Sequence, residues 1–265
     1  MSARVAFETA RAEGRAALVG YWPAGFPDAD GAVDAIRVMV EAGVDVVEVG
    51  LPYSDPVMDG PTIQAAAQQA LEGGTRTRQV LHTVEQVAAL DVPTVVMSYW
   101  NPVARYGVPR FAADLADAGG AGMITPDLTP DSAGAWITAA DDHDLDKVFL
   151  IAPSSTDERV AMTTAACRGF VYATAVMGVT GARESSSDLA GPLVARARST
   201  TDLPIAVGLG VSTAAQAAEV ASYADGVIVG SAFVRTHLDP EGGRRGALAS
   251  LSSLAGELAE GVRNG

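Results

Sequence analysis

Two carboxylates near the end of one short apolar run are the side chains best placed for acid–base chemistry in this chain. Glu48 lies close to the end of the run 44–49, and Asp59 follows in a loop rich in proline and glycine. An ionised carboxylate buried at a strand end costs several kcal/mol of stability unless a partner or a ligand compensates. Two carboxylates in different environments can divide the roles of proton donor and proton acceptor. The segment therefore predicts a site at which protons are transferred.

Eight short runs rich in Val, Ile and Leu supply the elements that would position these carboxylates. Amphipathic, alanine-rich stretches of helix length separate the runs. Most runs are almost entirely apolar, as expected of parallel strands that are buried on both faces. We expect strands at 17–22, 44–49, 94–98, 122–125, 148–152, 170–174, 205–207 and 226–229.

Eight strand-and-helix units in 265 residues predict an α/β fold of the (β/α)8 TIM barrel type. No tract typical of a linker divides the chain, so we expect a single domain over residues 1–265. A doubly wound open sheet is the alternative. The count of eight, and the lack of a GxGxxG pattern after the first strand, favour the barrel.

Helix signals fit the same pattern. An extra N-terminal helix over 2–13 is expected to cap the bottom of the barrel. Further helices are expected at 32–42 and 213–221. Their start signals are Asp28 or Asp30 for the first and Ser212 for the second.

In a barrel, the end of the strand at which a residue lies is informative, because catalysis in such barrels takes place at the carboxyl ends of the strands. Glu48 lies at that end of the second strand, and Asp59 lies in the loop that follows. Structural roles are the alternatives, with Glu48 as the partner of an arginine and Asp59-Gly60 as a turn. Lys147 is the only lysine and lies at the start of the fifth strand, at the opposite end of the barrel. A lysine Schiff base is therefore not expected.

Three glycine clusters follow the last three strands, at 177–183, 207–212 and 229–232. Loops after strands seven and eight, with the N-terminus of a short extra helix, commonly bind phosphate in this fold. Glycine lets backbone N–H groups approach an anion, and the helix dipole favours negative charge. The clusters therefore predict a phosphorylated substrate and a short phosphate-binding helix after strand eight.

Composition argues against several partners and sites. A net charge of −14 argues against nucleic acid or an anionic membrane as the main partner. No apolar run reaches the roughly 18 residues of a membrane helix. A single cysteine, Cys167, fits a reducing cytoplasm, where we expect the protein to be located. No metal is expected, because the histidines lack metal-ligand spacing; we expect surface positions for His82, His143 and His237.

With these motifs, the chain resembles the tryptophan synthase α subunit family from about residue 17 to residue 234. The resemblance is carried by the segments 48–64, 23–27, 178–181, 208–212 and 230–231. It implies a lyase of tryptophan biosynthesis that cleaves indole-3-glycerol phosphate to indole and glyceraldehyde 3-phosphate. It further implies that this retro-aldol reaction needs neither a metal nor a coenzyme.

The resemblance also implies roles for individual residues. Glu48 matches the general acid–base that protonates C3 of the indole, and Asp59 matches the carboxylate that interacts with the indole N–H. Substrate contacts are implied for Tyr21, Met97, Tyr99, Tyr172, Thr180 and Leu209. Phosphate binding is implied for Gly181, Gly210, Gly230 and Ser231.

A partner is implied in the same way. The family works as an α2β2 heterotetramer with a β subunit that alone carries pyridoxal phosphate and consumes the indole. The matching contact residues are Pro52, Asp55, Pro56 and Asn101. Two other functions stay open: a free-standing lyase with the same chemistry, and a non-catalytic phosphate-binding scaffold that activates a partner. The presence of both Glu48 and Asp59 argues against the scaffold.

Overall fold

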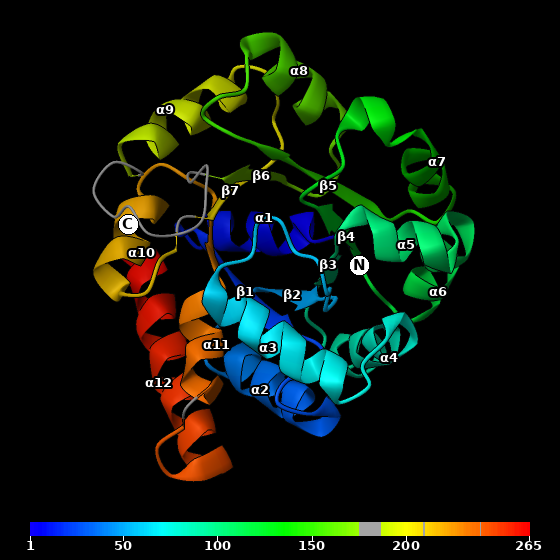
Figure 1. Cartoon of the computed structure of the whole chain (residues 1–265). Coiled ribbons are helices and arrows are strands. Elements are labelled where there is room, and N and C mark those ends of the chain that lie inside the picture. The colour runs from blue at the N-terminus through cyan, green and yellow to red at the C-terminus, as the bar shows by residue number, and fades with distance from the viewer. Residues whose placement is uncertain (175–186, 209, 239) are drawn as a thin grey trace.

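Eight parallel strands close into a barrel in the order of the sequence (Figure 1). The computed structural model describes residues 1–174, 187–208, 210–238 and 240–265. The strands are β1 (Ala17–Pro23), β2 (Val46–Gly50), β3 (Thr94–Met97), β4 (Gly122–Thr125), β5 (Asp146–Ile151), β6 (Val171–Thr174), β7 (Ile205–Gly208) and β8 (Gly226–Val229). The barrel predicted from the eight apolar runs is confirmed.

A ring of helices surrounds the strands (Figure 1). These helices bury apolar faces against the outside of the barrel, as the alternation of strand and helix predicts. The ring contains α2 (Ala29–Glu41), α3 (Pro61–Glu72), α4 (Thr77–Ala88), α5 (Trp100–Tyr106), α6 (Val108–Asp117), α7 (Gly134–Asp142), α8 (Asp157–Ala166), α9 (Ser187–Arg198), α10 (Ala214–Ala221), α11 (Ser231–Leu238) and α12 (Gly243–Arg263). A short 3-10 helix, η1 (Pro130–Ser132), precedes α7 and buries no residue.

The extra N-terminal helix, α1 (Arg4–Ala12), lies across one end of the barrel (Figure 1). Its Phe7 ring packs on Phe170, immediately before β6, with 5.1 Å between the ring centroids. The same cluster of buried side chains includes Val46 and Val148 inside the barrel, so α1 closes the amino ends of the strands. The predicted cap is confirmed, and the opposite end is left for a site.

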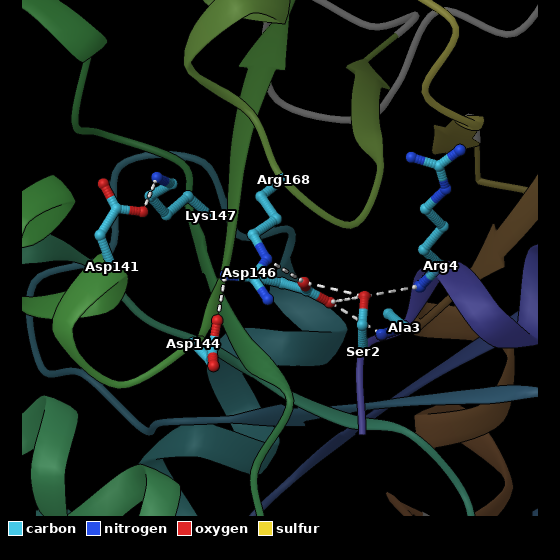
Figure 2. A network of polar contacts seen from close by, with 8 residues as sticks. All are labelled: Ser2, Ala3, Arg4, Asp141, Asp144, Asp146, Lys147 and Arg168. Carbon is cyan, nitrogen blue, oxygen red and sulfur yellow. Dashed lines mark hydrogen bonds and ion pairs between the residues drawn. The ribbon is translucent and has the colours of Figure 1, made fainter.

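Asp146, at the start of β5, fixes this cap (Figure 2). Its carboxylate accepts hydrogen bonds from Ser2 Oγ at 2.9 Å and from the Ala3 backbone N–H at 2.7 Å. The Arg168 guanidinium lies 3.7 Å away and balances the buried charge. Lys147 extends to Asp141 beside this network, so the only lysine lies at the amino end of the barrel, as its place in the sequence predicts.

Helix α2 starts three residues before the expected range, after one of its two predicted start signals, and α10 starts one residue later than expected. Asp28 caps α2, since its Oδ1 accepts a hydrogen bond from Gly31 N at 2.7 Å. The cap of α10 is Thr213 and not Ser212, because Thr213 Oγ1 accepts from Gln216 N at 3.3 Å. Ser212 instead bonds to the Gln216 side chain.

His237 is buried, so the predicted surface position is wrong for this histidine. It lies on the inner face of α11, where its ring meets the Trp22 ring edge-on at 4.8 Å. Burial lowers the pKa of the imidazole to about 4, so it packs as a neutral aromatic ring. Its spacing from Phe233 and Val234 was the available signal, because residues three and four apart share one helix face. His82 and His143 are exposed as predicted.

Candidate active site

Glu48 points into the barrel near the carboxyl end of β2. Val46 shares its face of the strand and belongs to the cluster inside the barrel, whereas Val47 and Val49 pack toward the helices. The Glu48 side chain is buried, and its Oε1 makes no hydrogen bond with the residues that the structure describes. Burial raises the pKa of Glu48 to about 8. The carboxyl is therefore largely protonated near neutral pH and ready to donate a proton.

Asp59 is held by a tyrosine from the next strand-to-helix connection. Tyr99 Oη donates a hydrogen bond to Asp59 Oδ1 at 3.0 Å and accepts one from the Met58 backbone N–H at 3.0 Å. Gln64, in the first turn of α3, donates to the Asp59 backbone carbonyl at 2.7 Å. Burial raises the pKa of Asp59, and the hydrogen bond from Tyr99 opposes this shift. The tyrosine thus stabilises the charged form of Asp59.

Two further tyrosines lie near Glu48, and one of them, Tyr21, also lies near Asp59. Burial raises the pKa of Tyr21, and the charges of Asp59 and Glu48 raise it further, so its phenol lies within the field of both acids. Burial and the charge of Glu48 raise the pKa of Tyr172 in the same way. Both phenols stay protonated. Together with Tyr99 they form an apolar, uncharged lining suited to a planar aromatic ring.

Two glycines make room for these rings. Sequence analysis gave Gly50 no role in the site and included Gly208 only in a glycine cluster expected to bind phosphate. A Cβ at Gly50 would collide with the Tyr21 hydroxyl, and a Cβ at Gly208 would collide with the Tyr172 hydroxyl. Each glycine lies on the strand beside its tyrosine, because β1 pairs with β2 and β6 pairs with β7. Glycine at the last position of both strands was the signal in the sequence, but the need for it depends on the cross-strand neighbour.

The candidate phosphate binders lie at the same end of the barrel. Gly210 follows β7 with a φ of +72°, and the space beside its Cα is open. Gly230 and Ser231 begin α11, and Gly230 lies against Tyr21, since a Cβ there would contact Tyr21 Cβ at 3.4 Å. An open backbone next to a helix N-terminus can receive an anion. Thr180, Gly181 and Leu209 lie outside the described residues.

The remaining predicted residues lie at or beyond the carboxyl ends of β2 and β3. Met97 ends β3 and packs on the cluster inside the barrel. Among the predicted partner contacts, Asp55 and Asn101 are exposed, Pro56 is half-buried and Pro52 is buried. The predicted site residues that the structure describes therefore all lie at one end of the barrel.

Within the described residues, no group of three or more His, Cys, Asp or Glu side chains is arranged to hold a metal ion. No helix in this part of the chain combines the length and apolar character needed to cross a membrane.

Known proteins are similar to this chain in sequence and fold. The sequence profile of the tryptophan synthase alpha chain family matches residues 7–263. The tryptophan synthase alpha chain of Nocardia farcinica is 60% identical over 258 residues, which cover 97% of this chain and 94% of that one. The alpha chain of Salinispora arenicola is 61% identical over 259 residues, or 98% of this chain and 97% of that one.

Solved structures agree. A structure of Mycobacterium tuberculosis tryptophan synthase matches with a TM-score of 0.91 and 54% identity, covering 98% of each chain. The tryptophan synthase subunit alpha of Legionella pneumophila matches with a TM-score of 0.90 at 29% identity, over 100% of this chain and 99% of that one. The resemblance found in the motifs is confirmed over nearly the full length. The chain belongs to the tryptophan synthase alpha chain family and is a lyase that cleaves indole-3-glycerol phosphate to indole and glyceraldehyde 3-phosphate.

Proposed function

We propose that Glu48 and Asp59 carry the proton transfers of this cleavage, Glu48 at C3 of the indole and Asp59 at N1. The observation that supports this proposal is the contrast between the two carboxyls. Glu48 is buried, with a pKa raised to about 8, whereas Asp59 accepts a hydrogen bond that favours its charged form. One group is therefore prepared to give a proton and the other to take one.

In the first step of the proposed mechanism, Glu48 gives its proton to C3 and the Asp59 carboxylate takes the proton of N1. The ring becomes an indolenine with a double bond between C2 and N1. Protonation at C3 is needed because the bond to this aromatic carbon can break only when its electron pair has a place to go.

In the second step both carboxyls regain their starting protonation states, while the proton given to C3 stays on the indole. The Glu48 carboxylate takes the proton of the hydroxyl on the carbon attached to C3, and that carbon becomes the aldehyde of glyceraldehyde 3-phosphate. The electron pair of the broken bond forms the C2–C3 double bond. The electron pair of the C2–N1 double bond moves to N1, which recovers its proton from Asp59. Both carboxyls end as they began.

We propose that the substrate lies with its indole among Tyr21, Met97, Tyr99, Tyr172, Thr180 and Leu209. Its phosphate is proposed to contact the backbone at Gly181, Gly210, Gly230 and Ser231. The open backbone at Gly210 and the helix N-terminus at Ser231 support this placement, since both offer N–H groups to an anion. Gly230 lies against Tyr21, and this contact supports a phosphate end next to the indole.

Replacing Gly210 with valine is expected to weaken substrate binding through the phosphate. The branched side chain would occupy the open space where the anion approaches the backbone. We expect KM for indole-3-glycerol phosphate to rise about 10- to 100-fold, the equivalent of losing one hydrogen bond to a charged group. The affinity for indole alone, measured by calorimetry, should stay close to that of the parent.

Gly14→Val is the matched control for this variant. Gly14 has a similar positive φ of +74° and equally open space, but it lies in the turn after α1 at the other end of the barrel. The backbone strain of valine is therefore the same at both positions. Equal KM values for the two variants would place the phosphate elsewhere.

We also propose that the chain is one domain, located in the cytoplasm, that assembles with a tryptophan synthase β subunit as α2β2. No cofactor is proposed for this chain, and pyridoxal phosphate is assigned to the partner. The likeness to the M. tuberculosis tryptophan synthase structures supports the assembly. Val57 and Met58, which are 73% and 46% exposed, add apolar surface beside the proposed contacts Pro52, Asp55, Pro56 and Asn101.

Mixing the purified chain with a β subunit from a close relative tests the assembly. We expect co-elution in size-exclusion chromatography and a rise in the rate of indole-3-glycerol phosphate cleavage, because an ordered partner surface restricts the loop that carries Asp59. Separate elution with an unchanged cleavage rate would instead identify a free-standing lyase.

A further inference from the structure

The loop that carries Asp59, residues 51–60, is joined to the segment between β3 and α5 by an aromatic pair. The rings of Tyr53 and Tyr99 pack with their centroids 5.4 Å apart and an interplanar angle of 36°. Asn101 Nδ2 donates a hydrogen bond to Tyr53 Oη at 3.1 Å. The Tyr53 hydroxyl is therefore held by Asn101 in the first turn of α5, and the Tyr53 ring packs against Tyr99.

The hydroxyl of Tyr99 contacts the loop that carries Asp59. It is buried, and its Oη accepts from Met58 N while it donates its single proton to Asp59 Oδ1. Burial and the charge of Asp59 raise the pKa of this phenol to about 12, so it remains a donor over the working pH range. The position of the Tyr99 ring thus sets the position of the hydroxyl that orients the Asp59 carboxylate.

Tyr53 itself does not hydrogen-bond to Asp59 in the contacts described above. It is half-buried and lines a groove of about 370 Å³ together with Pro56 of the loop and with Pro61, Gln64 and Gln68 of α3. Tyr53 influences Asp59 through its packing against the Tyr99 ring. Two packed aromatic rings gain stability beyond the area that they bury, and this gain favours one ring orientation over another.

We propose that Tyr53 is a positioning residue for the lyase reaction, which keeps the Tyr99 ring where its hydroxyl can hold Asp59 toward the indole N–H. The inference rests on the proposed role of Asp59 and adds a residue that does not touch the substrate. When the Tyr53 ring is lost, the Tyr99 hydroxyl moves away from Asp59. Asp59 then loses a hydrogen bond to its charged form, and a higher pH is required to keep it ionised.

Replacing Tyr53 with leucine tests this inference through the pH profile of kcat/KM. We expect kcat to fall about 10-fold, in proportion to one weakened hydrogen bond to a charged group, with little change in KM. The acidic limb of the profile should move to higher pH by about one unit. Tyr99→Phe, which removes the donor directly, should move the same limb in the same direction. The double variant should be no worse than Tyr99→Phe, because the two residues act in series.

Two variants guard against an effect on folding alone. Tyr53→Phe keeps the ring and loses the bond from Asn101, so it should recover most of the kcat lost in Tyr53→Leu. Tyr106→Leu is the matched control, because Tyr106 also packs on an aromatic ring, Phe111, and hydrogen-bonds a carboxylate, Asp114, away from the site. It should leave the acidic limb unchanged.

The outcomes separate this inference from the proposed function. An unmoved acidic limb in Tyr53→Leu overturns the role of Tyr53. If the leucine variant does not fold, Tyr53→Phe takes its place: an unmoved limb in a phenylalanine variant that has lost activity overturns the role in the same way. If Asp59→Asn is inactive at the same time, the role of Asp59 stands and only the inference fails. If Asp59→Asn cleaves the substrate at the parent rate, the proposed function fails as well.

Discussion

Glu48→Gln is expected to lose most of the turnover of indole-3-glycerol phosphate while the barrel stays folded. Glutamine keeps the shape of the side chain and has no proton to give to C3, and general acid–base catalysis typically contributes ~10²–10⁴-fold in rate. The measurement is kcat for release of indole, with the affinity for glycerol phosphate as a check that the phosphate site is intact. A glutamine variant with a kcat within threefold of the parent would contradict the catalytic role.

The pH profile adds a sharper form of the same prediction. In the parent, kcat/KM should fall as the pH rises through about 8, because the free enzyme then loses the Glu48 proton that the first step requires. In Glu48→Gln the residual activity should lack this fall. A basic limb that survives in the variant would belong to another group.

Glu48→Gln is expected to be at least as stable to unfolding as the parent at pH 8. The pKa of Glu48 is raised from its ordinary value of 4.5 to about 8, so between these pH values the folded chain binds more protons than the unfolded chain. Folded stability contributed by this site therefore falls as the pH rises through this window. Glutamine removes the dependence, so the melting temperature of Glu48→Gln at pH 8 should equal or exceed that of the parent. A lower value would indicate lost packing.

The fold was predictable because its pattern is repeated eight times. Apolar runs buried on both faces fix the strands, and their number fixes the closed barrel. The ends of the strands were less predictable, because polar contacts decide them. β2 begins at Val46 because Asp45 accepts hydrogen bonds from Arg15 and from Leu18 N, whereas β5 extends back to Asp146, whose carboxylate bonds α1.

Parts of the candidate site could be predicted where the type and sequence position of a single residue are informative. An acid near the carboxyl end of a buried strand, such as Glu48, is unusual in any sequence. A single glycine at a strand end most often only makes a turn, so the anion site was predicted from three glycine clusters together. Gly50, Gly208 and Tyr53 have meaning only through a neighbour in space: a tyrosine on the adjacent strand for the glycines, and a ring from another loop for Tyr53. No pattern along the chain contains these pairs.

Asp59→Asn is expected to lower kcat about as strongly as Glu48→Gln, for a different physical reason. Asparagine keeps an oxygen that can accept the hydrogen bond from Tyr99 Oη, so the loop should keep its position. It cannot take the proton of N1, and it offers no charge to the nitrogen while C3 is protonated. We expect kcat to fall by ~10²–10⁴-fold, with KM changed little because the phosphate and the aromatic lining are untouched.

The acidic limb of the pH profile should disappear with the Asp59 carboxylate. In the parent, kcat/KM should fall as the pH decreases through the pKa of Asp59, which burial raises above its ordinary value. Asp114→Asn is the matched control, since Asp114 also accepts a hydrogen bond from a tyrosine, Tyr106 Oη at 2.5 Å, on the outside of the barrel. The control should keep the parent kcat and the parent acidic limb. An Asp59→Asn variant that behaved like this control would show that the anion at N1 is dispensable, and Glu48 would then have to carry both proton transfers alone.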